Sequence, residues 1–171
     1  MESQRLEHLR TGGQRSLLIR PTTAADLPRL YEMHSDPASC EMAGTKPRTR
    51  EAFMTHWEGI FANPKIIPRT IEARENGSVE IVGSVNLFQA DGLDMVGYNI
   101  ARRHWGRGIA TRALELLLEE VKVRPLHATA ARANAASARV LERCGFRCTG
   151  YHMGEETERY LAREVASFVL E

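Results

Sequence analysis

Long hydrophobic segments are missing from this 171-residue sequence. No apolar run approaches the roughly 18 residues that a membrane-spanning helix needs. The first residues are charged, with Glu2, Arg5, Glu7 and Arg10, and they contain no apolar core of the kind found in a secretory signal peptide. We therefore expect a cytoplasmic protein that does not interact with membranes.

The sequence also contains few cysteines and has a small net charge. The three cysteines, Cys40, Cys144 and Cys148, are an odd number without a secretion signal, which predicts reduced thiols. Cys144 and Cys148 are four residues apart with no second pair, so we predict no metal site. A net charge of +1 disfavours a general polyanion-binding surface, and with it nucleic acid as a partner.

The sequence does contain enough apolar residues for one core. With 43% hydrophobic and 26% charged residues it has the composition of an ordinary globular domain, and we expect a single domain over residues 1–171. Residues 1–15 are polar and include two adjacent glycines, which predicts a flexible N-terminal extension.

Hydrophobic periodicity predicts a chain that mixes helices and strands. Strands are expected over residues 16–20, 70–74, 80–88, 94–101, 125–132, 146–153 and 163–170, with an Asn76-Gly77 hairpin turn. Helices are expected over residues 23–35, 49–62, 109–122 and 134–144, and residues 38–48 are expected to form a loop. The strand–helix–strand order around the third helix implies parallel pairing, and therefore a mixed α/β (α+β) sheet.

Residues 102–111 join a predicted strand to a predicted helix. Gly106 and Gly108 allow the backbone to turn tightly and to approach a ligand closely. The first N–H groups of the following helix lack partners, and the helix dipole favours an anion there. Arginine side chains at 102, 103, 107 and 112 suit phosphate geometry. The segment therefore predicts a phosphate-binding turn.

Two common phosphate motifs do not fit this segment. The P-loop requires Gly, four residues and then Gly-Lys-Ser/Thr, which the sequence lacks. The dinucleotide fingerprint would need Gly or Ala at Thr111 and an acidic residue about twenty positions later, and neither is present.

The segment instead resembles the acetyl-CoA pyrophosphate loop of GNAT N-acetyltransferases, whose pattern is Gln/Arg-x-x-Gly-x-Gly/Ala and which residues 103–108 match. Residues 18–27, 97–100 and 134–146 are similar to phrases of the RimJ/RimL-like branch, the last to its Asn-x-x-Ser…Gly-Phe helix. The order of elements agrees over nearly the whole chain. The resemblance implies the GNAT fold, a splayed mixed sheet of six to seven strands with about four helices, and acetyl-CoA as co-substrate.

The resemblance also implies roles for individual residues. The backbone of the loop would hold the pyrophosphate, through Arg103, His104, Trp105, Gly106, Arg107, Gly108 and Ile109. Ile100 and Ala101 would bind the pantetheine arm, and Asn134 and Ser137 would reach its sulfur end.

The two proton-handling residues common in the family are displaced here. The position of the usual tyrosine acid holds Leu141, so Ser137 is expected to donate a proton to the leaving thiolate, with Tyr151 as the alternative. The position of a frequent glutamate base holds Met95, and the neighbouring Asp94 should point to the other face of the strand. A site without a strong base favours an amine of low pKa. At pH 7.4 an α-amine is roughly a fifth neutral, and a lysine side chain only about one part in a thousand.

The resemblance therefore predicts an N-acetyltransferase in which a primary amine attacks acetyl-CoA directly. The acceptor is a protein or peptide N-terminus or a small-molecule amine, and the protein is a monomer or a homodimer. The alternative is a non-catalytic acyl-CoA-binding or sensing module. Two features stay open: Tyr98 either touches substrate or packs in the core, and the acidic run 155–158 is a solvated turn or attracts a cationic amine.

Overall fold

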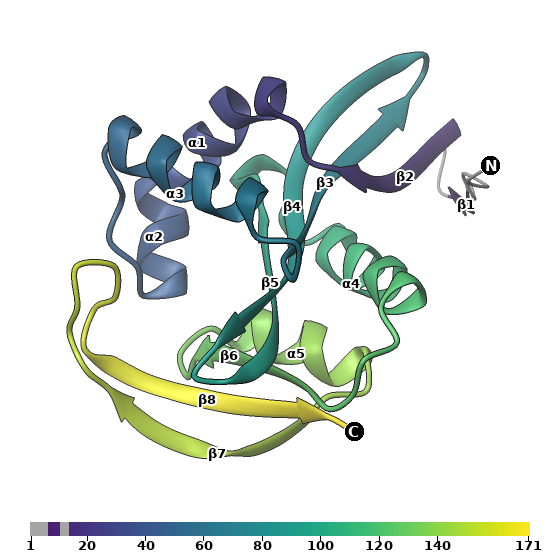
Figure 1. The fold of residues 1–171 in the computed structure, drawn as a ribbon. Coiled ribbons are helices and arrows are strands. Elements are labelled where there is room, and N and C mark those ends of the chain that lie inside the picture. Colours follow the sequence, from purple (N-terminus) through teal and green to yellow (C-terminus); the bar gives the residue numbers. More distant parts are fainter. Residues whose placement is uncertain (1–6, 11–13) are drawn as a thin grey trace.

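A mixed β-sheet forms the centre of the protein in the computed structural model, which describes residues 7–10 and 14–171 (Figure 1). Within these residues the sheet has eight strands in the order β1-β2-β3-β4-β5-β6-β8-β7. The strands are β1 (Glu7–Arg10), β2 (Gln14–Pro21), β3 (Ile67–Glu75), β4 (Ser78–Ala90), β5 (Leu93–Ile100), β6 (Leu126–Ala131), β7 (Arg147–Gly154) and β8 (Arg163–Leu170). The mixed sheet is confirmed, with one short strand, β1, more than the expected six to seven.

Part of the expected N-terminal extension lies outside the described residues, at 1–6 and 11–13. Of the remainder, β1 pairs antiparallel with β2, with His8 opposite Ser16. The strand at 16–20 was thus predicted too short at its N-terminal end, because the polar residues before it carry no hydrophobic alternation.

Helices cover both faces of this sheet. They are α1 (Leu27–Ser35), α2 (Pro37–Ala43), α3 (Arg50–Ala62), α4 (Ile109–Glu120) and α5 (Ala135–Arg143), with 3-10 turns η1 (Ala24–Asp26) and η2 (Arg102–His104). Val82 packs in the core under α4, whereas its neighbour Ile81 packs against α1 and α3. Because successive strand side chains alternate, the two helical layers lie on opposite faces. None of the helices in the described ranges has the length and apolarity needed to span a membrane.

Helix α2 corrects the expected loop at 38–48. Asp36 and Pro37 end α1, but they also begin the next helix: the Asp36 carboxylate accepts a hydrogen bond from the Ser39 N–H at 3.0 Å, and Pro37 occupies the first helical position. Gly44, with φ of 69°, ends α2. The prediction used the Asp-Pro pair only as a stop signal.

The sheet opens between β5 and β6, the one parallel pair in the described sheet. These strands pair only at Met95 and His127, near their N-terminal ends, after which β6 continues beside β8 (Figure 1). The predicted parallel pairing is confirmed. Because the strands then diverge, the edge of β5 near Ile100 is left without a neighbouring strand.

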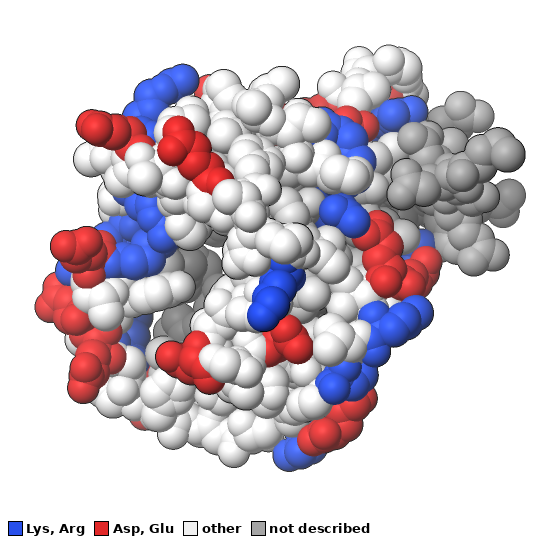
Figure 2. Space-filling model, in the orientation of Figure 1, with Lys and Arg blue, Asp and Glu red and all other residues white. Residues whose placement is uncertain are grey.

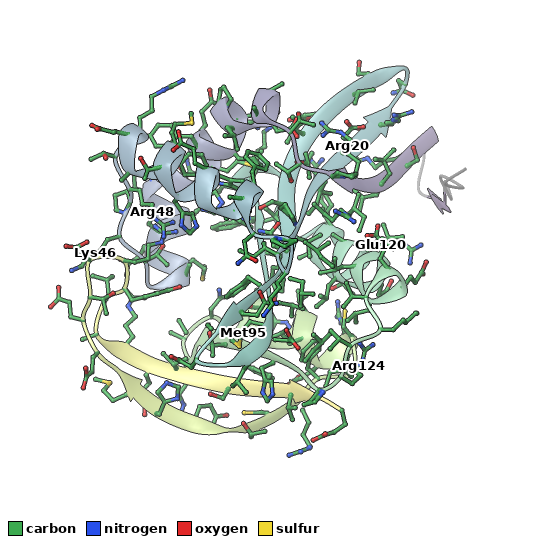
Figure 3. All side chains as sticks on the ribbon, in the orientation of Figure 1. Arg20, Lys46, Arg48, Met95, Glu120 and Arg124 are labelled. Atoms are coloured by element: carbon green, nitrogen blue, oxygen red, sulfur yellow. The ribbon has the colours of Figure 1, made fainter. Side chains whose placement is uncertain are left out.

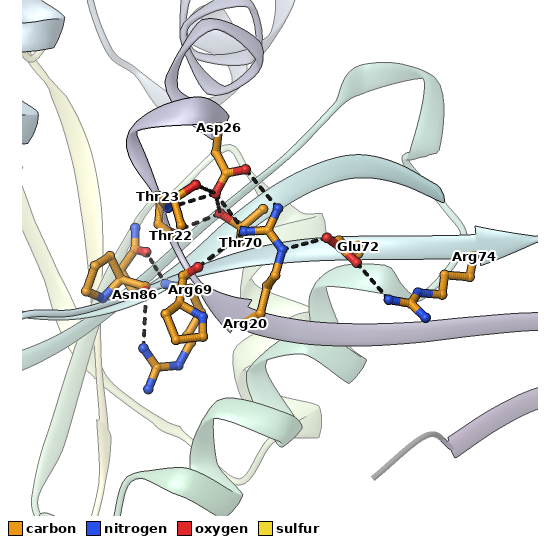
Figure 4. A network of polar contacts seen from close by, with 11 residues as sticks. Arg20, Thr22, Thr23, Asp26, Arg69, Thr70, Glu72, Arg74 and Asn86 are labelled. Carbon is orange, nitrogen blue, oxygen red and sulfur yellow. Dashed lines mark hydrogen bonds and ion pairs between the residues drawn. The ribbon is translucent and has the colours of Figure 1, made fainter. Parts of the chain in front are cut away.

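A polar network fastens the start of α1 to the sheet (Figure 4). The Arg20 guanidinium donates to both Asp26 oxygens at 2.7 and 2.8 Å and to Glu72 at 2.5 Å. The Thr70 hydroxyl donates to Asp26 at 3.0 Å. Burial alone would raise the pKa of Asp26, but the bonds from Arg20, Thr23 and Thr70 outweigh it and hold that pKa below its ordinary value. The network thereby fixes the connection between β2 and the α1 layer.

Candidate active site

The turn between β5 and α4 has the backbone that its glycines predict. Gly106 and Gly108 have φ angles of 75° and 76°, a region that residues with a Cβ avoid. A Cβ built at either position would meet no atom within 4 Å, so the glycines serve conformation rather than packing. The turn leads directly into α4 at Ile109.

Most backbone amides of this turn are open, but two are not. The His104 N–H donates to the Ala101 carbonyl at 2.8 Å and the Trp105 N–H to the Arg102 carbonyl at 3.1 Å, within η2. These amides were expected to face a ligand, and the 3-10 turn uses them instead. From Gly106 to Thr111 no backbone N–H has an acceptor in the described chain; helical bonding starts with Arg112. The open amides form an anion-binding concavity at a helix N-terminus.

Trp105 fastens the turn to the open edge of the sheet. Its indole N–H donates to the Ile100 carbonyl at 2.9 Å. The Ala101 N–H donates to Val82 of β4 at 2.8 Å, and because backbone groups of successive residues alternate between strand edges, the Ile100 N–H faces the gap towards β6. Of the two residues expected to bind pantetheine, Ile100 therefore offers its amide to the gap, while the Ala101 amide is occupied.

The arginines at 102, 103 and 107 differ in whether a carboxylate lies close to them. Arg103 forms an ion pair with Glu80, which also contacts the His104 ring at 3.1 Å, and Arg102 lies 3.4 Å from Asp36. Burial and the positive charges of Arg103 and Arg107 lower the pKa of His104, which favours a neutral ring. Arg107 contacts only His104 in the described structure, at 3.5 Å, and has no carboxylate partner there. Arg107 is therefore the guanidinium best placed for a phosphate.

Ser137 is held in place from two sides. Asn134 caps α5 by accepting a hydrogen bond from the Ser137 N–H at 3.1 Å. The Ser137 hydroxyl lies 2.7 Å from the Tyr98 hydroxyl, which also lies 3.1 Å from the Ser137 carbonyl oxygen. Burial raises the pKa of Tyr98 to about 12, so its hydroxyl stays protonated at neutral pH. The single Tyr98 proton can be accepted by the Ser137 carbonyl or by the Ser137 hydroxyl, and donation to the hydroxyl leaves the serine proton free for another acceptor.

The Tyr98–Ser137 contact was not predicted. From the sequence, Tyr98 either touches substrate or packs in the core. Alternation along the strand places Tyr98 on the same face as Ile100, but nothing in the neighbouring residues predicts a contact with α5, 39 positions further along the chain. In the structure the Tyr98 ring packs on the main core, and its hydroxyl contacts Ser137, which lines the cavity.

One cavity of about 870 Å³ joins these features. Its lining includes residues 104–111 of the turn, Tyr98 to Ile100 of β5, 128–131 of β6, and Asn134 and Ser137 of α5. Its other half is lined by α2 and by the segment between β7 and β8. The cavity thus brings together the loop, Ile100, Asn134 and Ser137, as the sequence led us to expect.

Tyr151 does not join this group. It lies on the outer strand β7, is 56% exposed, and stacks beneath the Arg132 guanidinium at 4.0 Å. Met95 and Leu141, at the positions where relatives place the base and the acid, are buried apolar side chains. Asp94 accepts a hydrogen bond from Gln89 at 3.0 Å. Among the expected proton donors, Ser137 is the one that lines the cavity.

Solved structures of acetyltransferases share this fold. Vibrio cholerae spermidine N-acetyltransferase in complex with CoA and spermine is similar at a TM-score of 0.76 and 15% identity, covering 90% of this chain and 94% of that one. RimL, the ribosomal L7/L12 α-N-protein acetyltransferase in complex with coenzyme A, is similar at 0.71 and 16%, covering 90% and 93%. Mycobacterium smegmatis RimJ in complex with CoA-disulfide is similar at 0.69 and 22%, covering 92% and 82%.

Sequence comparison defines the family more firmly. Residues 16–147 match the family described as acetyltransferase (GNAT) domain. A search of curated proteins gives no match. Because the family match covers most of the chain, the protein belongs to the GNAT acetyltransferases, and it is an acyltransferase by class.

Proposed function

We propose that this protein transfers the acetyl group of acetyl-CoA directly to a primary amine. The observation that carries the proposal is that the open amides of residues 106–111 and the hydroxyl of Ser137 line the same cavity, at the gap between β5 and β6. A coenzyme with a diphosphate at one end and a thioester at the other matches that arrangement.

In this proposal the coenzyme lies along the open edge of β5. Its diphosphate accepts hydrogen bonds from the amides of the turn, assisted by Arg107. Its pantetheine arm takes the place of a strand beside Ile100, whose amide faces the gap. RimL and RimJ of the same fold were solved with forms of coenzyme A, which supports this choice.

The chemistry needs few protein groups. The neutral amine attacks the thioester carbon, the new C–N bond forms, and the C–S bond breaks to release a thiolate. Ser137 donates a hydrogen bond to that sulfur and, as it passes its proton to the thiolate, takes the proton of Tyr98, which solvent then restores. The amine gives up its proton to solvent, because Met95 and Leu141 supply neither base nor acid. An α-amine or another amine of low pKa is therefore the favoured acceptor.

A turnover screen tests the proposal. Release of free thiol from acetyl-CoA is measured with N-terminal peptides, polyamines, aminoglycosides and amino acids, and the acetylated product is identified by mass. We expect acetylation of an α-amine or small low-pKa amine. Tight acetyl-CoA binding without turnover on any amine would instead support the non-catalytic binding module.

A further inference from the structure

The half of the cavity opposite the coenzyme turn is built by two distant segments that pair with each other. Thr45 and Tyr160 form an isolated β-bridge. The Lys46 N–H donates to the Arg159 carbonyl at 2.7 Å, and the Leu161 N–H donates to the Gly44 carbonyl at 2.9 Å. This pairing joins the end of α2 to the segment between β7 and β8, and it brings Arg159 beside Arg48.

Four basic side chains gather at this wall: His34 of α1, Arg48 between α2 and α3, His56 of α3, and Arg159. We call them the basic cluster. Burial lowers the pKa of Arg48, as does the positive charge of Arg159. Burial, Arg48 and Arg159 likewise lower the pKa of His56. No carboxylate in the described chain contacts any member of the cluster, and the Arg159 guanidinium donates only to the Lys46 carbonyl. Arg48 and Arg159 therefore place two positive charges at this wall without a carboxylate counter-ion in the described chain.

His34 lines the cavity with unused hydrogen-bonding groups. Both ring nitrogens are buried, and neither has a partner among the described residues. Its ring packs on Phe53, with centroids 5.6 Å apart. Burial, Arg159, Arg48 and His56 lower the pKa of His34 to about 4, so the ring is neutral and carries one N–H donor. A buried polar group without a partner is costly, which points to a ligand that completes its hydrogen bonding.

Acidic side chains near this wall are mostly engaged elsewhere. Glu41 accepts from Arg163 at 2.7 Å, and Glu156 from Lys46 at 2.8 Å. Asp91 and Glu155 also line the cavity, but neither forms an ion pair with Arg48 or Arg159 in the described chain. Figure 3 shows Arg48 on the inner side of the segment between α2 and α3. Figure 2 shows Lys and Arg side chains beside the hollow on this side of the molecule, and acidic side chains both further out and along its lower rim.

We propose that the basic cluster binds an anionic oxygen group, a carboxylate or a phosphate, carried by the acceptor amine. Arg159 and His34 line the cavity and would contact the anion, while Arg48 adds charge from behind them. The inference rests on the proposed function and narrows its substrate class: the acceptor is a negatively substituted amine, and a polycation such as spermidine is excluded by repulsion. It also opposes the expectation that the acidic run 155–158 attracts a cationic amine.

Matched amine pairs test this inference. Acetyl transfer from acetyl-CoA is compared for phosphoethanolamine against ethanolamine, and for Ala-Asp against Ala-Asn, both with an amidated C-terminus so that only Ala-Asp carries a carboxylate, with spermidine as a polycation. A preference within the first pair indicates that the site binds phosphate, and a preference within the second indicates that it binds carboxylate. The two comparisons therefore distinguish the two anions. We expect kcat/KM to be about tenfold or more higher for at least one anionic member than for its neutral partner, as for a charge-assisted hydrogen bond.

Substitutions test whether the basic cluster causes the preference for the anionic amine. The Arg48 side chain makes no hydrogen bond in the described structure. Arg48→Gln should therefore remove most of the preference for the anionic amine, and Arg48→Lys should restore part of it. Arg147→Gln on β7, a matched loss of one exposed arginine, should leave it unchanged. Thermal unfolding of each variant verifies that the fold is kept. Equal rates for both members of each pair, or a preference that survives Arg48→Gln, would overturn the anion site while leaving the acetyltransferase proposal intact.

A binding experiment decides the case in which no amine is acetylated. The protein is first saturated with CoA, which in the proposed function occupies the turn at 106–111, and is then titrated calorimetrically with phosphoethanolamine and, separately, with C-terminally amidated Ala-Asp. Binding of either ligand that Arg48→Gln weakens about tenfold supports the anion site even if transfer is not observed. Absence of binding of both ligands, or equal binding by Arg48→Gln and the parent protein, refutes it.

Discussion

At the scale of single residues, we predict that proton donation depends on Ser137 and on the tyrosine that contacts it. Ser137→Ala removes the only hydroxyl that both lines the cavity and contacts Tyr98 in the described chain. We expect kcat to fall about 100-fold, the low end for general acid catalysis, with little change in acetyl-CoA affinity. Steady-state kinetics with a separate calorimetric titration of acetyl-CoA would measure both. A fall in affinity alone would show that Ser137 only binds the coenzyme.

Tyr98→Phe tests whether Tyr98 positions the serine proton. The ring and its packing remain, but the hydroxyl that lies 2.7 Å from Ser137 is lost. We expect kcat to fall about tenfold, as for the loss of one hydrogen bond that aligns a reacting group, with KM nearly constant. Tyr151→Phe is the matched control, because that hydroxyl lies on the exposed face of β7. If Tyr151→Phe lowered kcat instead, the alternative acid predicted from the sequence would be the right one.

At the scale of elements, the turn before α4 must keep two residues in the left-handed region. Gly108→Ala introduces a Cβ at φ of 76°, which costs roughly 1–2 kcal/mol in that conformation. We expect the turn to relax and the affinity for CoA, measured by calorimetry, to fall about tenfold. Gly77→Ala in the β3–β4 hairpin has a comparable φ of 81° and should lower stability without changing CoA affinity. Equal affinity for both variants would argue against the turn as the diphosphate site.

At the scale of the whole molecule, the Arg20–Asp26 network controls stability towards acid. The pKa of Asp26 is lower when folded than when unfolded, so the ionised carboxylate stabilises the fold above the ordinary aspartate range. That stability is lost as pH falls through the folded pKa. Asp26→Asn leaves Arg20 with only one of its two buried carboxylate partners, Glu72, and should lower the free energy of unfolding at pH 7 by about 3 kcal/mol.

Urea unfolding at a series of pH values measures this effect. The parent protein should lose stability below pH 4, whereas the Asp26→Asn curve should be flatter there. Glu32→Gln removes an exposed partner of Arg29 on α1 and is the matched control, with a change under about 1 kcal/mol. A parent protein and an Asp26→Asn variant with parallel pH curves would contradict the assignment.

Local sequence patterns predicted the elements whose signals are local. The strand at 163–170 and the start of α4 at Ile109 were found where the structure has them, because alternating and helical periods depend on adjacent residues. The Asn76-Gly77 turn could be predicted because these two residues favour the backbone geometry of a tight hairpin turn. Helix α2 was missed because Asp36 and Pro37 end one helix and begin another, and the sequence pattern by itself gives equal support to both interpretations.

The sequence by itself determined the family and the backbone of the turn at Gly106 and Gly108, because glycine conformation and helix-end chemistry depend on neighbouring residues. The structure also showed a local 3-10 turn that uses the His104 and Trp105 amides internally. Only the tertiary structure decided that Tyr98 reaches Ser137 and that Arg48 lies beside Arg159. Those two contacts join positions 39 and more than 100 residues apart, and their geometry depends on how β5 and β6 diverge and how the segments at 44–46 and 159–161 pair. No local period encodes such long-range packing.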